Sequence, residues 1–159
     1  MQNHYDFMKI ALEEAQVAYR EGEIPVGAVL VSEGRILAKA HNSPITKNDP
    51  SAHAELLALR QAGETIGNYR LVGAQLYVTL EPCIMCAGAI IQARLSRVIF
   101  GVRDPKNGAV VSLYKILTDE RLNHQVKITE GILQEECGEL LSRFFRQKRI
   151  TSRPLRADN

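Results

Sequence analysis

Short apolar runs alternate with helical segments in the second half of the chain, and this alternation constrains the fold more than any other feature. Residues 75–80 and 97–102 are β-rich and almost continuously apolar, residues 84–93 between them are helical in character, and residues 126–129 form a shorter β-rich run. Strands without a polar face belong to a sheet that is covered on both sides. The pattern therefore predicts an α/β fold.

The first half of the chain adds a helix and a hairpin to this sheet. Apolar residues recur at helical spacing between Met8 and Tyr19, with Asp6 as the expected N-cap and Gly22 as the end of the helix. Two β-rich runs, 24–31 and 35–40, flank a short glycine-containing turn, which indicates an antiparallel hairpin.

The remaining segments complete one domain that spans residues 1–159. Residues 42–51, with two prolines, two asparagines and an aspartate, are expected to be a loop, and residues 53–62 a helix. The last helix carries its apolar residues on one stripe: Leu133, Cys137, Leu140, Leu141 and Phe144. We expect a three-layer α/β/α sandwich around a central mixed sheet of about five strands.

The net charge of +2 conceals an uneven distribution. Residues 143–159, the expected basic C-terminal helix end and tail, hold six basic residues and one acid, so the preceding 142 residues carry a net charge of −3. A basic tail is often only a solvated chain end, so it indicates a polyanionic partner only together with other features.

Absent sequence features predict the location. The N-terminus has no basic region followed by an apolar stretch, so no secretory signal is expected, and no apolar run reaches the ~18–20 residues of a membrane span. Three cysteines, an odd number, argue against a secreted disulfide framework. We therefore expect a cytoplasmic protein without a membrane partner.

Cys83 and Cys86 follow Pro82 at the expected start of a helix. Residues three apart lie on the same helix face, and the positive end of the helix dipole favours the thiolate form that binds metals. A C-x-x-C motif alone is equally compatible with a redox dithiol, half of a structural zinc site, or chance. Glu81, on the strand side of Pro82, is interpreted as structural or as support for the site.

His53 and Glu55 form a second cluster at the start of another helix. In mid-helix, residues two apart point about 200° away from each other, but directions are freer in the first turn. A His–Glu pair at a helix start is commonly just solvated. Together with the downstream P-C-x-x-C, however, H-x-E matches the signature of zinc deaminases.

The number of ligands indicates the type of zinc site. His53, Cys83 and Cys86 give three ligands, and a structural site has four. Cys137 is a possible fourth ligand, but its place on an apolar stripe favours packing. Three ligands leave a position open for water, and Glu55 is then the carboxylate placed to act as general base.

The motifs around these residues resemble the cytidine deaminase superfamily and, within it, the bacterial tRNA-specific adenosine deaminases. The resemblance rests on HAE at residues 53–55 and TLEPCIMCAGA at residues 79–89. Supporting segments are IPVGAVLV (24–31), NYRL (68–71), FGVRD (100–104) and LLSRFFR (140–146). The zinc motif is common to the superfamily, whereas the flanking segments and the basic ending favour the tRNA enzymes.

The resemblance implies a homodimeric enzyme with one Zn²⁺ per subunit, held by His53, Cys83 and Cys86. It implies conversion of adenosine to inosine at the wobble position of a tRNA anticodon, chiefly that of arginine, with Glu55 as the proton shuttle. Asn42 resembles the family's base-orienting asparagine, although an asparagine before a loop is commonly a turn residue.

Several residues are candidates for contact with an RNA anticodon stem-loop, whose single-stranded bases are the cheapest to unstack. Phe145 is the candidate for stacking on a base, because Phe144 has core spacing, and Arg146 and Arg149 are candidates for phosphate contacts. Asp104 is a candidate acceptor for a ribose 2′-hydroxyl, or only the start of an Asp-Pro turn.

Three other functions compete with this one. A deaminase of free cytidine, guanine or deoxycytidylate would have the same zinc motif but no use for a basic, aromatic C-terminal helix. A non-catalytic, zinc-stabilised RNA-binding module would not need Glu55. A C-x-x-C redox protein would leave both His53 and Glu55 unexplained.

Overall fold

A five-stranded mixed sheet in the order β2-β1-β3-β4-β5 forms the middle of the protein. The structure is a computed structural model that describes residues 3–152. The strands are β1 (Gly27–Ser32), β2 (Arg35–His41), β3 (Gln75–Leu80), β4 (Arg97–Val102) and β5 (Lys127–Glu130). β1 pairs antiparallel with both β2 and β3, whereas β3, β4 and β5 run parallel, which confirms the mixed sheet expected from the sequence.

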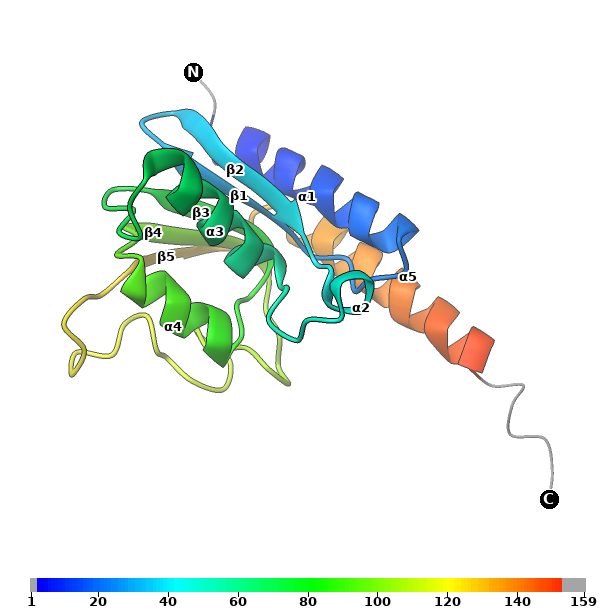
Figure 1. Cartoon of the computed structure of the whole chain (residues 1–159). Coiled ribbons are helices and arrows are strands. Elements are labelled where there is room, and N and C mark those ends of the chain that lie inside the picture. The colour runs from blue at the N-terminus through cyan, green and yellow to red at the C-terminus, as the bar shows by residue number, and fades with distance from the viewer. Residues whose placement is uncertain (1–2, 153–159) are drawn as a thin grey trace.

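Helices cover both faces of this sheet, as Figure 1 shows. They are α1 (His4–Arg20), α2 (Pro44–Lys47), α3 (Ala54–Ile66), α4 (Ile84–Gln92) and α5 (Gln134–Ser152). α1 and α5 lie on one face, and α3 and α4 lie on the other (Figure 1). The three-layer α/β/α sandwich is therefore confirmed.

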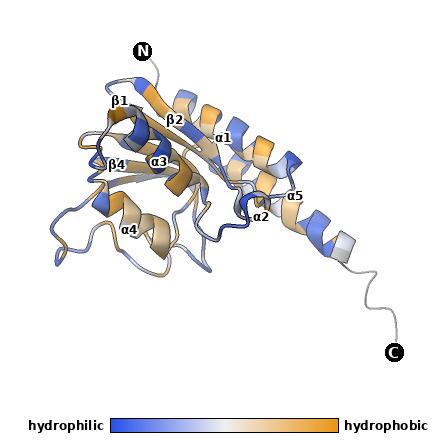
Figure 2. Cartoon of the chain, in the orientation of Figure 1, coloured by the Kyte–Doolittle hydropathy of each residue, from blue (hydrophilic) through white to orange (hydrophobic). Residues whose placement is uncertain are grey.

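The register of the central strands divides their side chains between two cores. Val29, Tyr77 and Ile99 are aligned across β1, β3 and β4 and pack with α1 and Cys137 of α5. Their neighbours along the strands, such as Leu30 and Phe100, pack on the opposite face with α3 and α4. Figure 2 shows the apolar strands between the helix layers. Burial on both faces explains why these strands lack a polar face in the sequence.

Gly27 shows how closely α1 lies on the sheet. A Cβ at this position would overlap the carbonyl oxygen of Ala11 and the amide nitrogen of Ala15. A glycine at the start of β1 therefore lets the backbone of α1 touch the strand directly.

The bounds of several elements differ from the sequence-based expectation by one to four residues, and three further differences are more specific. Asn3, not Asp6, caps α1, and Asp6 at position N3 bonds back to the Asn3 amide in a capping box. The expected loop 42–51 contains the short helix α2. Leu133 precedes α5 with a φ of 54°, so the expected apolar stripe begins one residue outside the helix.

Four connections meet at one edge of the sheet. The parallel strands β3 and β4 end there at Leu80 and Val102, and the antiparallel hairpin places Gly27 and His41 at the same edge. Besides the short link 131–133 from β5 to α5, the connections at this edge are residues 21–26, 42–53, 81–83 and the long segment 103–126, which contains no helix or strand but one isolated bridge at Gly108. Side chains from all four connections can therefore converge.

Among residues 3–152, no helix has both the length and the apolar character needed to cross a membrane. The basic residues Arg153 and Arg156, part of the expected tail, lie outside the described residues.

Candidate metal centre and active site

Two helix starts bring one imidazole and two thiols together. His53 is the N-cap residue of α3, Cys83 is the N-cap residue of α4, and Cys86 lies in the first turn of α4. His53 Nδ1 lies 3.6 Å from Cys83 Sγ and 3.5 Å from Cys86 Sγ. The three ligand atoms lie within 4.8 Å of one another. Neither N-cap side chain makes a capping hydrogen bond to its own helix, so both side chains are available to a metal.

The thiols and the imidazole perturb one another's protonation. Hydrogen bonding with Cys86 and His53 lowers the pKa of Cys83 to about 4, while the same contact with Cys83, together with burial, raises the pKa of Cys86. The hydrogen bond to Cys83 likewise raises the pKa of His53. The thiolate form of Cys83 is therefore favoured beside Cys86 and His53. This is expected at a site where a bound cation replaces the protons of its ligands.

This donor set fits zinc. Imidazole and thiolate ligands suit Zn²⁺ and disfavour Mg²⁺ and Ca²⁺, which prefer oxygen. Within residues 3–152, this is the one group of three or more His, Cys, Asp or Glu side chains with suitable spacing. Cys137 is buried against β4 at Gly101, and burial raises its pKa to about 12, which confirms the expected packing role.

Glu55 lies beside the metal-binding group in the first turn of α3. Its side chain is only 4% exposed, and burial raises its pKa. Glu55 and His53 line the same cavity, so the first turn of α3 does bring both side chains to one place despite their spacing. A carboxyl group with a raised pKa can both accept and return a proton near neutral pH.

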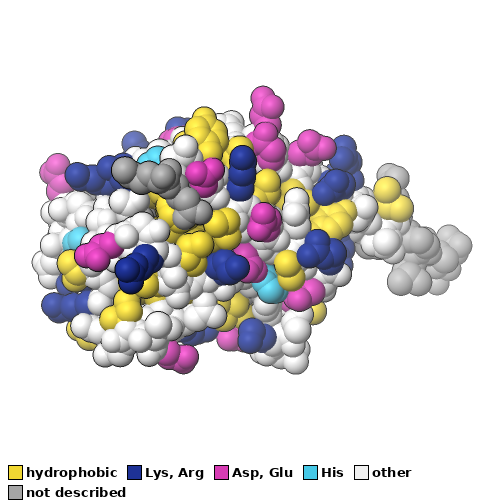
Figure 3. Space-filling model, turned by 90° about the horizontal axis from the view of Figure 1, so that it is seen from above, with side chains coloured by type: hydrophobic (Ala, Val, Ile, Leu, Met, Phe, Trp, Pro, Cys, Tyr) yellow, Lys and Arg dark blue, Asp and Glu magenta, His cyan; other side chains and the backbone are white. Residues whose placement is uncertain are grey.

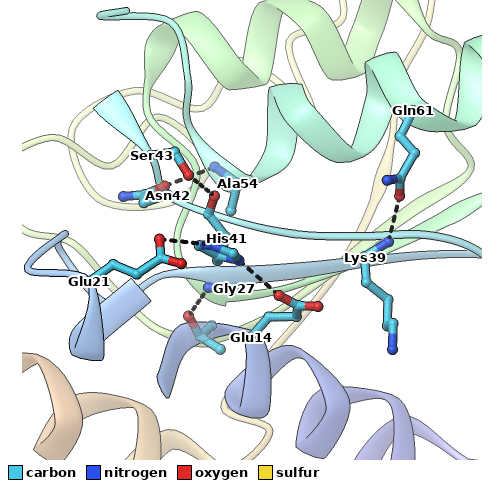
Figure 4. A network of polar contacts seen from close by, with 10 residues as sticks. Glu14, Glu21, Gly27, Lys39, His41, Asn42, Ser43, Ala54 and Gln61 are labelled. Atoms are coloured by element: carbon cyan, nitrogen blue, oxygen red, sulfur yellow. Dashed lines mark hydrogen bonds and ion pairs between the residues drawn. The ribbon is translucent and has the colours of Figure 1, made fainter. Parts of the chain in front are cut away.

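Asn42 connects the end of β2 to the start of α3. Its side-chain oxygen accepts a hydrogen bond of 2.8 Å from the backbone N–H of Ala54, as Figure 4 shows. The amide oxygen is thus occupied, which leaves the amide nitrogen as the group that Asn42 offers to the cavity it lines. His41, the preceding residue, contacts Glu14 and Glu21 of the α1 region through its two ring nitrogens and fixes this end of β2 (Figure 4).

The cavity in front of these residues has a volume of about 930 Å³ and receives side chains from all four connections and from α5. Six large apolar residues that are exposed to solvent also line it: Ile24, Ile45, Ile84, Leu113, Tyr114 and Phe145. Only Phe145 among them was expected from the sequence. Ile45 is an isolated apolar residue in the polar stretch 42–51, which was an available signal, whereas Leu113 and Tyr114 lie in the apolar stretch 109–117 and have no such signal.

The candidate RNA-contact residues do not all lie at the cavity. Asp104 and Phe145 line it, with Phe145 43% exposed. Asp104 Oδ1 accepts hydrogen bonds from the backbone N–H groups of Lys106 and Asn107, so one of its oxygens serves the turn. Arg146 and Arg149 are exposed farther along α5. Figure 3 shows basic side chains close together where α5 leaves the body of the protein.

Glu81 is the second buried carboxylate near the cysteines, and it faces the connection 103–126. It is 2% exposed and accepts hydrogen bonds from the backbone N–H groups of Asp104, Val110, Val111 and Ser112 and from the Ser112 hydroxyl. Burial alone would raise its pKa, but these hydrogen bonds outweigh burial and lower it. The structural interpretation of Glu81 therefore agrees with its contacts.

Known proteins resemble this chain over most of its length. Residues 1–102 match the family model for the cytidine and deoxycytidylate deaminase zinc-binding region. The tRNA-specific adenosine deaminases of Bacillus subtilis and Aquifex aeolicus are both 50% identical to it over 143 residues. These alignments cover 90% of this chain, 89% of the Bacillus protein and 94% of the Aquifex protein.

Solved structures show the same relationship. A chain from work on A-to-I editing by tRNA:A34 deaminases at the wobble position of transfer RNA superposes with a TM-score of 0.83 at 45% identity, covering 85% of this chain and 98% of that one. A guanine deaminase from Nitrosomonas europaea, 20% identical, has a TM-score of 0.80 over 91% of this chain and 85% of its own. The second likeness shows that the fold is shared at low sequence identity.

Proposed function

The chain belongs to the cytidine and deoxycytidylate deaminase zinc-binding family, as one of its tRNA-specific adenosine deaminases, and on that premise we propose how it acts on the wobble adenosine of a tRNA anticodon. The reaction is hydrolytic: adenosine at position 34 and water give inosine and ammonia. The observation that carries the reaction type is the three-ligand group with Glu55 buried beside it in an accessible cavity.

The protein's own residues divide the work in this reaction. His53, Cys83 and Cys86 hold Zn²⁺, which when bound acts as a Lewis acid that activates water. Glu55 accepts a proton from the attacking water and delivers it to N1 of the adenine ring as C6 is attacked. Glu55 then transfers the second proton to the amino group, which departs as ammonia. Burial raises the pKa of Glu55, which favours its protonated form as a proton donor.

Asn42 orients the base in this proposal. Because its oxygen is bonded to Ala54, its amide nitrogen faces the substrate as a donor. Purine ring nitrogens accept hydrogen bonds, so a fixed N–H donor can hold the ring in one orientation. The hydrogen bond from Ala54 also fixes Asn42 relative to α3, the helix that carries Glu55. The base held by Asn42 would therefore have a fixed position relative to the proton shuttle.

The apolar rim of the cavity favours an RNA loop over a free base. A single adenine base would occupy a small part of 930 Å³, and an exposed apolar rim is suited to bases that leave their stack on either side of the target. Phe145 would stack on one such base, and Arg146 and Arg149 would contact phosphates.

Asp104 has a more specific proposed role. Its Oδ2 would accept the ribose 2′-hydroxyl, while Oδ1 holds the turn. Asp104→Asn should then lower the ratio of RNA to DNA turnover, measured on matched stem-loops. An unchanged ratio would assign Asp104 to the turn alone.

The biological setting follows from the proposed substrate. We expect tRNA-Arg to be the main substrate and the cytoplasm to be the location.

We also expect a homodimer, formed by a second copy of this chain on the groove between α3 and α4, where Tyr69 is 70% exposed beside Leu59 and Ala89. Sedimentation of the purified protein tests the dimer.

The decisive experiment combines inosine formation with metal analysis. Wild-type protein, Glu55→Gln and the exposed control Glu139→Gln are incubated with an anticodon stem-loop, and ammonia and zinc are measured on the same preparations. General acid–base catalysis contributes about 10²–10⁴-fold, so Glu55→Gln should lose at least that much turnover while it retains zinc. Full activity of Glu55→Gln would refute its role as proton shuttle, whereas binding of the stem-loop without inosine formation by the wild-type protein would favour a non-catalytic RNA-binding module.

A truncation separates RNA editing from deamination of free bases. Removing residues 146–159 takes away Arg146, Arg149 and the rest of the basic end but leaves Glu55 and the zinc ligands in place. Turnover of tRNA should fall. Unchanged turnover of tRNA would contradict the proposed contacts, and faster turnover of cytidine or guanine than of tRNA by the full chain would favour a free-base enzyme.

A further inference from the structure

We propose that Glu81 is a positioning residue for RNA binding, because its buried carboxylate organises the part of the connection 103–126 that forms one wall of the cavity. The proposal builds on the proposed function, since RNA is the ligand whose binding the wall would serve. It concerns a residue that does not touch the reacting atoms and acts through the loop that it holds.

The first observation is the number of donors around one carboxylate. Oε1 accepts the Asp104 N–H at 3.0 Å and the Ser112 hydroxyl, and Oε2 accepts the N–H groups of Val110, Val111 and Ser112 at 3.0, 2.8 and 2.9 Å. Both ends of the segment 104–112 are therefore bound to a single side chain. A buried carboxylate is tolerated only where donors replace its water, and here five do so.

The second observation is that the loop is fitted to this carboxylate. A Cβ on Gly108 would overlap all three carboxyl atoms of Glu81. The backbone of Gly108 also forms an antiparallel bridge with Cys83, and the N–H of Ala109 donates to the carbonyl oxygen of Pro82 at 2.9 Å. The loop thus wraps around Glu81 and joins the chain segment that begins α4.

The third observation is what the loop carries. Asp104, Lys106, Asn107, Leu113 and Tyr114 all line the cavity and lie within this segment or directly after it. The long connection 103–126 has no helix or strand of its own to hold these residues. Loops of this length without regular structure need other contacts to adopt one conformation. The five hydrogen bonds to Glu81 supply such contacts for the part of the connection between Asp104 and Ser112.

These observations separate Glu81 from Glu55, although both are buried carboxylates beside the cysteines. Glu55 faces the cavity from α3 and moves protons, whereas both oxygens of Glu81 are occupied by donors from the loop. Loss of Glu81 should therefore weaken RNA binding more than it slows the chemical step.

The test uses Glu81→Gln in the full-length, zinc-loaded protein. Glutamine keeps the size of the side chain but places an NH₂ donor against backbone N–H groups. Ser112→Ala removes one of the five donors and provides a milder perturbation. Gly108→Ala disturbs the packing of the loop against the Glu81 carboxylate by adding a Cβ on the loop side. Glu120→Gln, an exposed position in the same connection, is the matched control.

Amide hydrogen exchange provides the readout that does not depend on activity. Hydrogen bonds to charged groups are worth about 1.5–3 kcal/mol, which corresponds to about 10–150-fold in exchange rate. The amides of residues 104 and 110–112 should exchange faster by about that factor in Glu81→Gln, with a smaller change in Ser112→Ala and none in Glu120→Gln. Unchanged protection in Glu81→Gln would overturn the proposal.

Steady-state kinetics on an anticodon stem-loop provide the functional readout. We expect KM to rise at least about tenfold in Glu81→Gln and Gly108→Ala with a smaller fall in kcat, and Ser112→Ala to lie between them and wild type. A role confined to stability would lower the folded fraction without changing KM, so an unchanged KM in folded Ser112→Ala and Gly108→Ala would also overturn the proposal. Absence of inosine formation by the wild-type protein would refute the proposed function instead, and the exchange measurement would still decide whether Glu81 holds the loop.

Discussion

Glu23→Gln tests how a carboxylate holds the segment between Asn42 and His53. Glu23 is 1% exposed and accepts the N–H of Ile45 at 3.1 Å, the N–H of Thr46 at 2.7 Å and the Thr46 hydroxyl at 2.8 Å. These N–H groups belong to the first turn of α2, whose own N-cap residue makes no side-chain cap. Glu23 therefore caps a four-residue helix that could not persist alone.

The size of the effect follows from these contacts. Glutamine has a single acceptor oxygen, so it can keep the two bonds to Thr46 but must turn its NH₂ toward the Ile45 N–H. One bond is lost and two lose the contribution of a charged acceptor, for which we estimate about 2 kcal/mol in the free energy of unfolding. With an m-value of about 2 kcal/mol/M, the urea midpoint should fall by about 1 M.

The effect should depend on pH in a defined direction. Burial raises the pKa of Glu23, but the hydrogen bonds from Thr46 and Ile45 outweigh it and hold the pKa below its usual value of 4.5. A lowered pKa stabilises the folded state above the unfolded pKa, and this stabilisation is lost as the pH falls through the folded pKa. The difference between wild type and Glu23→Gln should therefore be full at pH 7 and shrink below about pH 4.5.

Urea unfolding followed by circular dichroism at several pH values measures this difference. All samples contain a chelator, so that loss of metal in acid does not contribute, and Glu13→Gln on the exposed face of α1 is the control. Equal midpoints for wild type and Glu23→Gln at pH 7 would refute the capping role. A difference that stays constant down to pH 3 would refute the assignment of its origin to the charged carboxylate.

Three further substitutions test other parts of the structure. Phe145→Ala should raise KM for the stem-loop by about 5–150-fold, because stacking on a base is worth ~1–3 kcal/mol, whereas Ile150→Ala, farther along α5, should leave KM unchanged. Cys137→Ala should lower stability by about 1 kcal/mol in thermal unfolding yet keep the zinc content that Cys86→Ala loses; a drop in zinc would instead make Cys137 a ligand. Gly27→Ala should lower stability by about 1–3 kcal/mol or more, because its Cβ has no space against the backbone of α1, and an unchanged melting temperature would contradict that close approach.

The central strands were predictable because the residues that determine their bounds lie within or directly next to each strand. The expected bounds 75–80 and 97–102 coincide with β3 and β4, since both strands are apolar on both faces and are followed by polar residues or a proline. The hairpin was predictable for a similar reason, because its turn residues Glu33 and Gly34 both have positive φ, as a tight two-residue turn requires.

The short helix α2 and the cap of α1 were not predictable in this way. Ser43 and Pro44 are a common helix start, but α2 has only four residues and is held by Glu23, about twenty positions earlier, so this local signal was not enough to predict it. At the start of α1, Asn3 and Asp6 are both good capping residues, and only the reciprocal bonds between them decide that Asn3 is the cap.

The candidate metal site was easier to predict than the wall of the cavity. The combination of H-x-E with P-C-x-x-C predicted that His53 lies beside Cys83 and Cys86, and the structure brings these three side chains together. The contributions of Leu113 and Tyr114 depend on the path of a long connection, which is fixed by tertiary contacts rather than by its own sequence pattern. The sequence indicated a structural or site-supporting role for Glu81 but not the partners that it binds.

The helix α5 consists of two halves that differ in how firmly they are anchored. Cys137, Leu140, Leu141 and Phe144 bury the first half against the sheet, whereas every side chain from Phe145 to Thr151 is exposed. The free energy of local opening should therefore fall along the helix, from the global value near Cys137 towards zero at its end. RNA bound by the contacts proposed for Arg146 and Arg149 would then order the less firmly anchored half of the helix. This ordering would lower the affinity gained per contact, but it would let the same helix adjust to anticodon loops of different shape.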